Sequence, residues 1–105
     1  MQFDFFGFPP PTPGPSAPTN LIGFQRQNDF GVIFELFNTL QWQPSDSLDV
    51  QGYYIYRNNV HIATVNSSTT SYQDHNQPFG VATLYGVAAF DEDGNVSDQI
   101  TITIG

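Results

Sequence analysis

The sequence contains no cysteine and no lysine, and only 11% of its 105 residues are charged. Without cysteine, the fold cannot depend on a disulfide bond or on a thiolate metal site. Ten acidic residues stand against two arginines, which gives a formal net charge of −8 at pH 7. This charge repels phosphate backbones and anionic lipid surfaces, so it predicts no nucleic-acid partner and no adhesion to membranes.

Long apolar runs are also absent. No segment approaches the ~20 apolar residues that cross a bilayer, which predicts no membrane insertion. The first residues lack a basic region, and Pro9 to Pro11 interrupt the apolar stretch, so we expect no secretory signal peptide. The compartment is unknown from these features, although the assembly role argued below favours an extracellular surface or a virion.

Composition divides the chain near residue 18. Residues 1–18 hold six of the eight prolines and four of the ten phenylalanines, namely Phe3, Phe5, Phe6 and Phe8. The stretch from Pro9 to Pro15 lacks most of the N–H donors that a helix or sheet needs, and it favours polyproline II. We therefore predict an extended arm over residues 1–18, with a semi-rigid proline spacer, followed by a folded domain over residues 19–105.

From residue 19 onward, apolar and polar residues alternate with the period of a β-strand, between clusters of turn residues. Seven strands are expected, at residues 20–25, 32–43, 50–57, 61–65, 69–73, 83–90 and 100–104. Asn58 and Asn59 tolerate positive φ and predict a tight hairpin. No segment has a helical apolar period, so the fold class is all-β: a seven-stranded antiparallel β-sandwich. Its core is expected to contain Trp42, Tyr53, Ile55, Tyr85 and Val87.

Five short blocks carry a resemblance to a known family. They are Leu40 to Pro44, Val50 to Asn58, Ile62 to Val65 with Thr70 to Tyr72, Tyr85 to Asp91, and Gly94 to Ser97. In order and spacing they resemble fibronectin type III modules, especially bacterial ones, over about residues 18–105. The resemblance implies a fibronectin type III-like sandwich in which Tyr85 is the corner tyrosine, with its hydroxyl bonded to upstream backbone.

Two segments depart from the family pattern. Four residues separate Gln77-Pro78-Phe79-Gly80 from Tyr85, so we expect a remodelled corner. The segment of about 16 residues before Trp42 is long, and we expect it to hold a bulge or an extended hairpin.

No group of residues predicts catalysis. Asp46 and Asp49 lie in a short predicted loop that offers no cleft between two carboxylates. No nucleophile, base and orienting residue are recognisable as a set, and no glycine-rich loop precedes a helix. We therefore expect the protein not to be an enzyme and to need no cofactor.

Two groups of residues are candidate metal sites. The segment Asp91 to Asn95 begins like a calcium loop, but Val96 and Ile102 stand where an EF-hand needs glycine and glutamate. His61 and His75 lie on different predicted elements, so a zinc site would need both of them and a carboxylate such as Asp74. We interpret the first group as an acidic turn and the histidines as surface residues, and we predict no metal.

The four phenylalanines of the arm are the strongest functional signal, because exposed apolar groups mark interfaces. Burying four such side chains contributes about 6–10 kcal/mol before ordering costs. The arm either folds back onto its own sandwich or docks on another molecule, and the proline spacer favours the second alternative. Tyr54, Tyr56 and Phe90, with Leu84, are expected on one outer face of the sandwich and form a second candidate partner-binding surface.

These features predict a non-catalytic structural or interaction module. It would assemble with a protein partner or with copies of itself through its arm, as in a surface fibre or a virion decoration or tail component. The alternative is an accessory module that binds carbohydrate or protein, with Tyr54, Tyr56 and Phe90 stacking on sugar rings.

Overall fold

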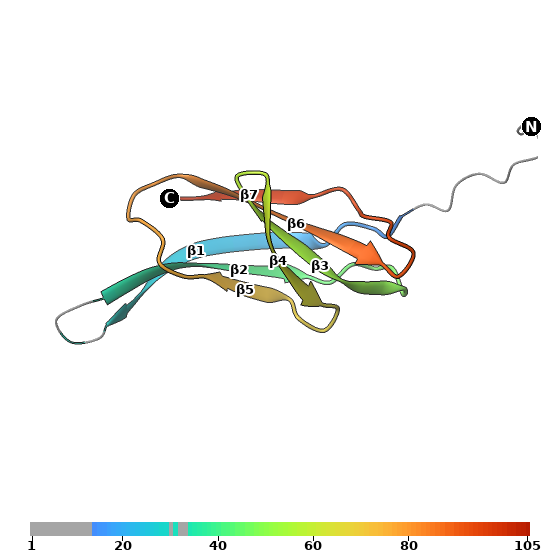
Figure 1. Cartoon of the computed structure of the whole chain (residues 1–105), viewed down its shortest axis with the longest axis horizontal. Helices are drawn as coiled ribbons and strands as arrows, with labels where there is room; N and C mark the ends of the chain where they lie inside the picture. The colour runs from blue at the N-terminus through green and yellow to red at the C-terminus, as the bar shows by residue number, and fades with distance from the viewer. Residues whose placement is uncertain (1–13, 30, 32–33) are drawn as a thin grey trace, which may run out of the picture.

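The domain is a β-sandwich of two antiparallel sheets (Figure 1). The computed structural model describes residues 14–29, 31 and 34–105. One sheet has the strand order β1-β2-β5 and the other β4-β3-β6-β7. The strands are β1 Thr19–Asp29, β2 Phe34–Gln43, β3 Val50–Arg57, β4 Val60–Asn66, β5 Ser71–Asp74, β6 Thr83–Asp91 and β7 Ile100–Ile104. No helix long and apolar enough to cross a membrane occurs in the described ranges.

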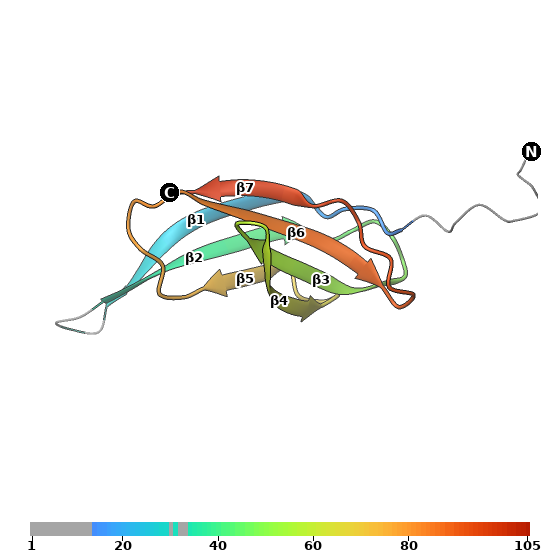
Figure 2. The same ribbon diagram turned by 45° about the horizontal axis from the view of Figure 1, so that its top comes forward.

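The first two strands form a long hairpin, as the extended segment before Trp42 predicted. Pairing continues to the end of β1, where Asp29 lies opposite Phe34. β1 is longer than expected. Residues 25–29 lack the apolar alternation that would predict a strand, and their pairing with β2 makes them part of it. The hairpin projects past the facing sheet (Figure 2), so the Phe34 side chain is 60% exposed although its position continues the inward alternation.

Asparagines close or bend the backbone at several points. Asn58 and Asn59 have φ values of 51° and 68°, and Arg57 pairs with Val60 across them. This confirms the predicted two-residue hairpin. Asn20 is also left-handed, with φ of 54°. It lies at a register shift in which β1 places two residues between the pairs Thr19–Gln43 and Ile22–Gln41, whereas β2 places one.

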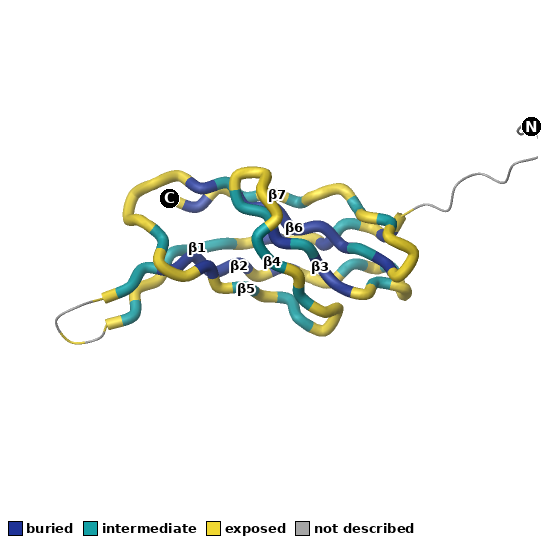
Figure 3. Tube along the Cα trace, viewed as in Figure 1, coloured by how far each residue is buried: buried dark blue, intermediate teal, exposed yellow. Residues whose placement is uncertain are grey.

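The core lies between the sheets (Figure 3) and contains the residues that the alternation predicted. Tyr53, Ile55, Tyr85 and Val87 are at most 1% exposed, and Trp42 is 3% exposed. The rings of Trp42 and Tyr53 meet edge to face, with their centroids 5.6 Å apart. Large aromatic side chains from both sheets therefore fill the space between them.

Candidate functional site

The last residues of the predicted arm are fastened to the sandwich. Pro15 and Pro18 are buried. The Ser16 amide donates to Ser47 Oγ at 2.9 Å, and the Ser16 hydroxyl lies 2.9 Å from Ser45 Oγ. These contacts hold residues 14–18 against the β2–β3 loop, at the end of the sandwich opposite the β1–β2 hairpin (Figure 1). The partner-binding candidates Phe3, Phe5, Phe6 and Phe8 lie outside the described residues.

The aromatic residues of the second candidate surface lie together on the four-stranded sheet, next to a histidine that sequence reasoning did not place there. We call Tyr54, Tyr56, His61 and Phe90 the outer aromatic cluster. Tyr54 and Phe90 stack with centroids 4.3 Å apart and an angle of 11°. His61 meets Tyr54 edge-on at 4.9 Å and Tyr56 at 5.7 Å.

The outer aromatic cluster is closely packed on the sheet. Ala88 lies opposite Tyr54 on this face and is fully buried, so the aromatic rings cover it. A Cβ built on Gly52 would lie 2.9 Å from the Phe90 ring, which shows that the ring rests on this glycine. Tyr54, Tyr56, Phe90 and Leu84 are half-buried. Because Tyr54 and Phe90 stack, each ring covers one face of the other. A partner could therefore contact mainly the uncovered faces and the edges of the aromatic rings in this cluster.

A buried polar network links the two sheets at Tyr85. The Tyr85 hydroxyl donates to Asp74 Oδ2 at 2.6 Å and accepts from Asn38 Nδ2 at 3.0 Å. Arg57 donates to both oxygens of Asp74, at 2.8 and 2.7 Å. Gln25 extends the network with a bond to Asn38 Oδ1. The prediction that the Tyr85 hydroxyl bonds to upstream backbone is therefore wrong. Its acceptor is the Asp74 carboxylate, which Arg57 holds in place.

This network changes two protonation equilibria. Burial raises the pKa of Tyr85, and the hydrogen bond to Asp74 raises it further. The hydrogen bond to Asp74 also raises the pKa of Arg57. Both groups therefore keep their protons under physiological conditions, and the network acts as a fixed clamp between the sheets.

The residues considered as metal ligands are separated by the fold. His61 bonds to Thr64 in β4, whereas His75 lies beyond β5 and contacts Glu35 at 2.9 Å. Asp74 is engaged by Arg57. Within residues 14–29, 31 and 34–105, no three such side chains gather into a group that could hold a metal ion.

The acidic segment at the end of β6 is a turn, and the Asp91 carboxylate accepts hydrogen bonds from backbone amides of the same turn. Asp91 Oδ1 accepts bonds from the amides of Asp93 and Asn95, and its Oδ2 accepts from Asn95 Nδ2. Burial raises the pKa of Asp91, but these hydrogen bonds outweigh it and leave the pKa below its ordinary value. The two candidate acids of the β2–β3 loop, Asp46 and Asp49, are exposed, and the Asp46 amide bonds to Ser16.

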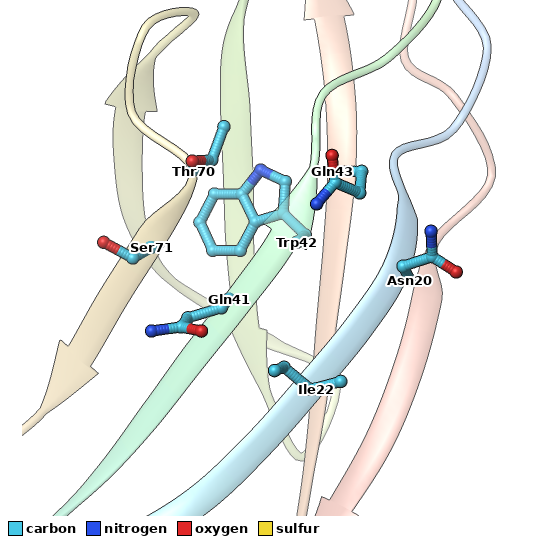
Figure 4. A pocket seen from close by; sticks show the side chains of 7 residues that line it. All are labelled: Asn20, Ile22, Gln41, Trp42, Gln43, Thr70 and Ser71. Atoms are coloured by element: carbon cyan, nitrogen blue, oxygen red, sulfur yellow. The ribbon is translucent and has the colours of Figure 1, made fainter.

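Sequence reasoning missed a hollow of about 340 Å³ on the three-stranded sheet (Figure 4). Trp42 lines it together with Asn20, Ile22, Gln41, Gln43, Thr70 and Ser71. These residues come from β1, β2, the start of β5 and the position just before it, so no local motif could reveal them together. One local signal was available. Gln41 and Gln43 flank the inward-facing Trp42, so both glutamines point to the outer face of the sheet, where the hollow lies.

No known protein-family model matches the chain. Two curated relatives do: Exoglucanase B of Cellulomonas fimi is 38% identical over 87 residues, or 82% of this chain, and an alpha-amylase of Niallia circulans is 37% identical over 90 residues, or 84%. The matches span only 7% and 6% of those proteins, so the chain corresponds to a small part of each.

Three solved structures share the architecture. An Fn3-like protein from Clostridium thermocellum superposes with a TM-score of 0.65 and 21% identity, over 87% of this chain and 92% of that one. "FN3tt mut" gives 0.63 and 17%, over 86% and 93%. The spore cortex lytic enzyme SleM of Clostridium perfringens gives 0.63 and 21%, over 87% and 28%. The chain is therefore a fibronectin type III-like β-sandwich, which confirms the resemblance read from its sequence blocks and the predicted all-β class.

Proposed function

We propose that this chain is a non-catalytic interaction module that joins a protein partner, or another copy of itself, through the phenylalanines of its arm. The supporting observation is that residues 14–18 pack against the sandwich and form hydrogen bonds to it. Pro15 and Pro18 are buried and Ser16 is bonded to the β2–β3 loop, so the arm starts from a defined point. A fixed start reduces the conformational entropy that docking of the arm must overcome.

Gly14, the first described residue of the arm, lies against the loop that follows β6. A Cβ built on Gly14 would lie 3.4 Å from the Val96 carbonyl, and Val96 pairs with Phe90. In the proposed assembly, the phenylalanines of one copy dock on the outer aromatic cluster of another. Passing arms from copy to copy would produce rings or filaments. A surface fibre or a virion decoration or tail component is the setting proposed for such assembly.

Light scattering tests this function. The full chain is expected to exceed the monomer mass at high concentration, and deletion of residues 1–8 is expected to give a folded monomer. Phe79→Ser is the matched control, because Phe79 is 83% exposed on the sandwich itself. Equal masses for the full chain and the deletion variant would refute self-assembly. If the full chain is monomeric, the protein-partner form of the proposal requires arm-dependent capture by an identified binding protein.

A second proposed function is carbohydrate binding as an accessory module. Its support is that the two relatives are named as an exoglucanase and an alpha-amylase, and that the domain carries exposed aromatic edges. Affinity electrophoresis in gels containing β-glucan or starch tests it. Retardation that Tyr54→Ala abolishes, with Phe79→Ala unchanged, would place the site on the outer aromatic cluster. Unretarded migration in both gels would contradict a role in binding these glucans.

A further inference from the structure

The hollow beside Trp42 is large enough for a small ligand. Gln41 pairs with Ile22 on one side and with Ser71 on the other, so the hollow extends over all three strands of its sheet (Figure 4). Its volume of about 340 Å³ lies near the lower end of the range for ligand pockets, about 300–1,000 Å³. It lies on the opposite sheet from the outer aromatic cluster.

The chemistry of the lining points to a neutral, hydroxyl-rich ligand. All the lining side chains are uncharged, although the chain carries a net charge of −8. The amides of Asn20, Gln41 and Gln43 both donate and accept hydrogen bonds, as do the hydroxyls of Thr70 and Ser71. These five side chains make no hydrogen bonds to one another or to other described residues, so their donors and acceptors are uncommitted. Sugar hydroxyls, which also donate and accept, match this set, whereas ions find no counter-charge.

Backbone irregularity places Asn20 at the hollow. This residue has a left-handed φ of 54° and lies in the register shift of β1. Bulges of this kind redirect side chains and are frequent beside binding sites. Asparagine tolerates the left-handed region better than most residues, so its amide is presented here at small conformational cost.

Two of the residues that line the hollow are apolar. Ile22 is 52% exposed, so it offers an aliphatic surface to the less polar face of a sugar ring. Trp42 also lines the hollow and is nearly buried, since its ring packs into the core. Its Nε1–H is buried and has no acceptor among the described residues, and Figure 4 shows the nitrogen on the side of the ring toward Thr70 and Gln43. Tryptophan N–H groups usually find a partner when buried, so an acceptor is missing at this point.

We propose that this hollow binds a single neutral sugar unit of a glucan chain. The inference rests on the second proposed function, carbohydrate binding, and assigns the site to the three-stranded sheet instead of the outer aromatic cluster. Gln41, at the centre of the three strands, is the principal hydrogen-bonding residue, and Ile22 supplies the apolar contact.

The single tryptophan of the chain provides a direct readout, because Trp42 lines the hollow. The full chain is titrated with cello- and malto-oligosaccharides up to about 10 mM, which would detect a Kd of about 1 mM. We expect a saturable change in Trp42 emission with at least one of the two. Gln41→Ala, an exposed substitution that should not impair folding, is expected to weaken binding at least tenfold. Gln73→Ala, which changes an exposed glutamine on β5 outside the hollow, should leave binding unchanged.

The outcomes separate the site from the function. Emission that does not respond, together with unretarded migration in glucan gels, contradicts both the site and the carbohydrate role. Retardation that Tyr54→Ala removes and Gln41→Ala leaves intact preserves the role but overturns the site. An oligo-uronate probe that binds as tightly as the neutral oligosaccharides would also overturn the proposal, because the lining offers a carboxylate no positive charge.

Discussion

The Tyr85 hydroxyl donates a 2.6 Å hydrogen bond to Oδ2 of Asp74, a residue at the end of a strand in the opposite sheet. Arg57 donates two hydrogen bonds to the same carboxylate. Side chains from β3, β5 and β6, in two sheets, therefore meet at Asp74. This clamp stands where the family resemblance predicted a bond from tyrosine to backbone. A side-chain acceptor makes the corner sensitive to single substitutions, because each partner can be removed separately.

Replacing Tyr85 by phenylalanine should destabilise the domain. The change removes a hydrogen bond to Asp74 and leaves the buried Asn38 amide without its acceptor. Unsatisfied buried groups of this kind cost about 1–3 kcal/mol. The free energy of unfolding in urea measures the loss. Tyr56→Phe is the control, since that half-buried hydroxyl makes no hydrogen bond to the described residues, and equal stability losses in the two variants would contradict the clamp.

Gly52→Ala should destabilise the sandwich more than Gly86→Ala. A Cβ at Gly52 would collide with the Val65 carbonyl, which the β3–β4 pairing holds, and would press on the Phe90 ring. A Cβ at Gly86 would collide with the end of the Gln99 side chain, which can move away, and would make an ordinary contact with Thr101. We expect a loss of about 1–3 kcal/mol for the first variant and well under about 1 kcal/mol for the second. Thermal unfolding of both proteins decides whether this order holds.

Acid should remove a stabilising contribution of Glu35. The hydrogen bond from Asn28 lowers the pKa of Glu35 below its ordinary value of 4.5; burial raises it, but His75 and the Asn76 amide lower it further. A folded-state pKa below the unfolded one means that the stabilisation is full above about pH 4.5 and disappears as the pH falls through the folded value. The difference in unfolding free energy between the natural protein and Glu35→Gln should therefore shrink on acidification.

Asn28→Ala extends this pH experiment, because it removes the largest cause of the lowered pKa. With the folded-state pKa closer to 4.5, the stability that Glu35 loses in acid should be smaller, and the loss should be complete at a higher pH than in the natural protein. Acid unfolding profiles that run parallel for the natural protein and Glu35→Gln would rule out the contribution of this carboxylate.

Residues 14–18 should stabilise the sandwich as part of it. Removing them loses two buried prolines and the bonds of Ser16 to the β2–β3 loop. We expect the free energy of unfolding of a chain that begins at residue 19 to be about 2–4 kcal/mol lower than that of a chain that begins at residue 14. Two truncated proteins of the same stability would place the start of the folded domain after these residues.

The sequence by itself determined the class of fold and most of its core. Alternation placed Trp42, Tyr53 and Tyr85 on inward faces, and the asparagine pair at 58–59 specified a hairpin. These features depend on neighbouring residues, because side-chain direction alternates along a strand and positive φ is a property of single residues. The sequence blocks resembling fibronectin type III modules led to the same architecture.

Only the tertiary structure decided which distant residues meet. Tyr85 and Asn38 are 47 positions apart, and no local pattern showed that Asn38 would be buried to bond with it. Likewise, the stack of Tyr54 on Phe90 followed from the register of β3 against β6, and the hollow beside Trp42 from a register shift in β1. Strand pairing and sheet packing set such contacts, and a shift of one residue moves each side chain to the opposite face.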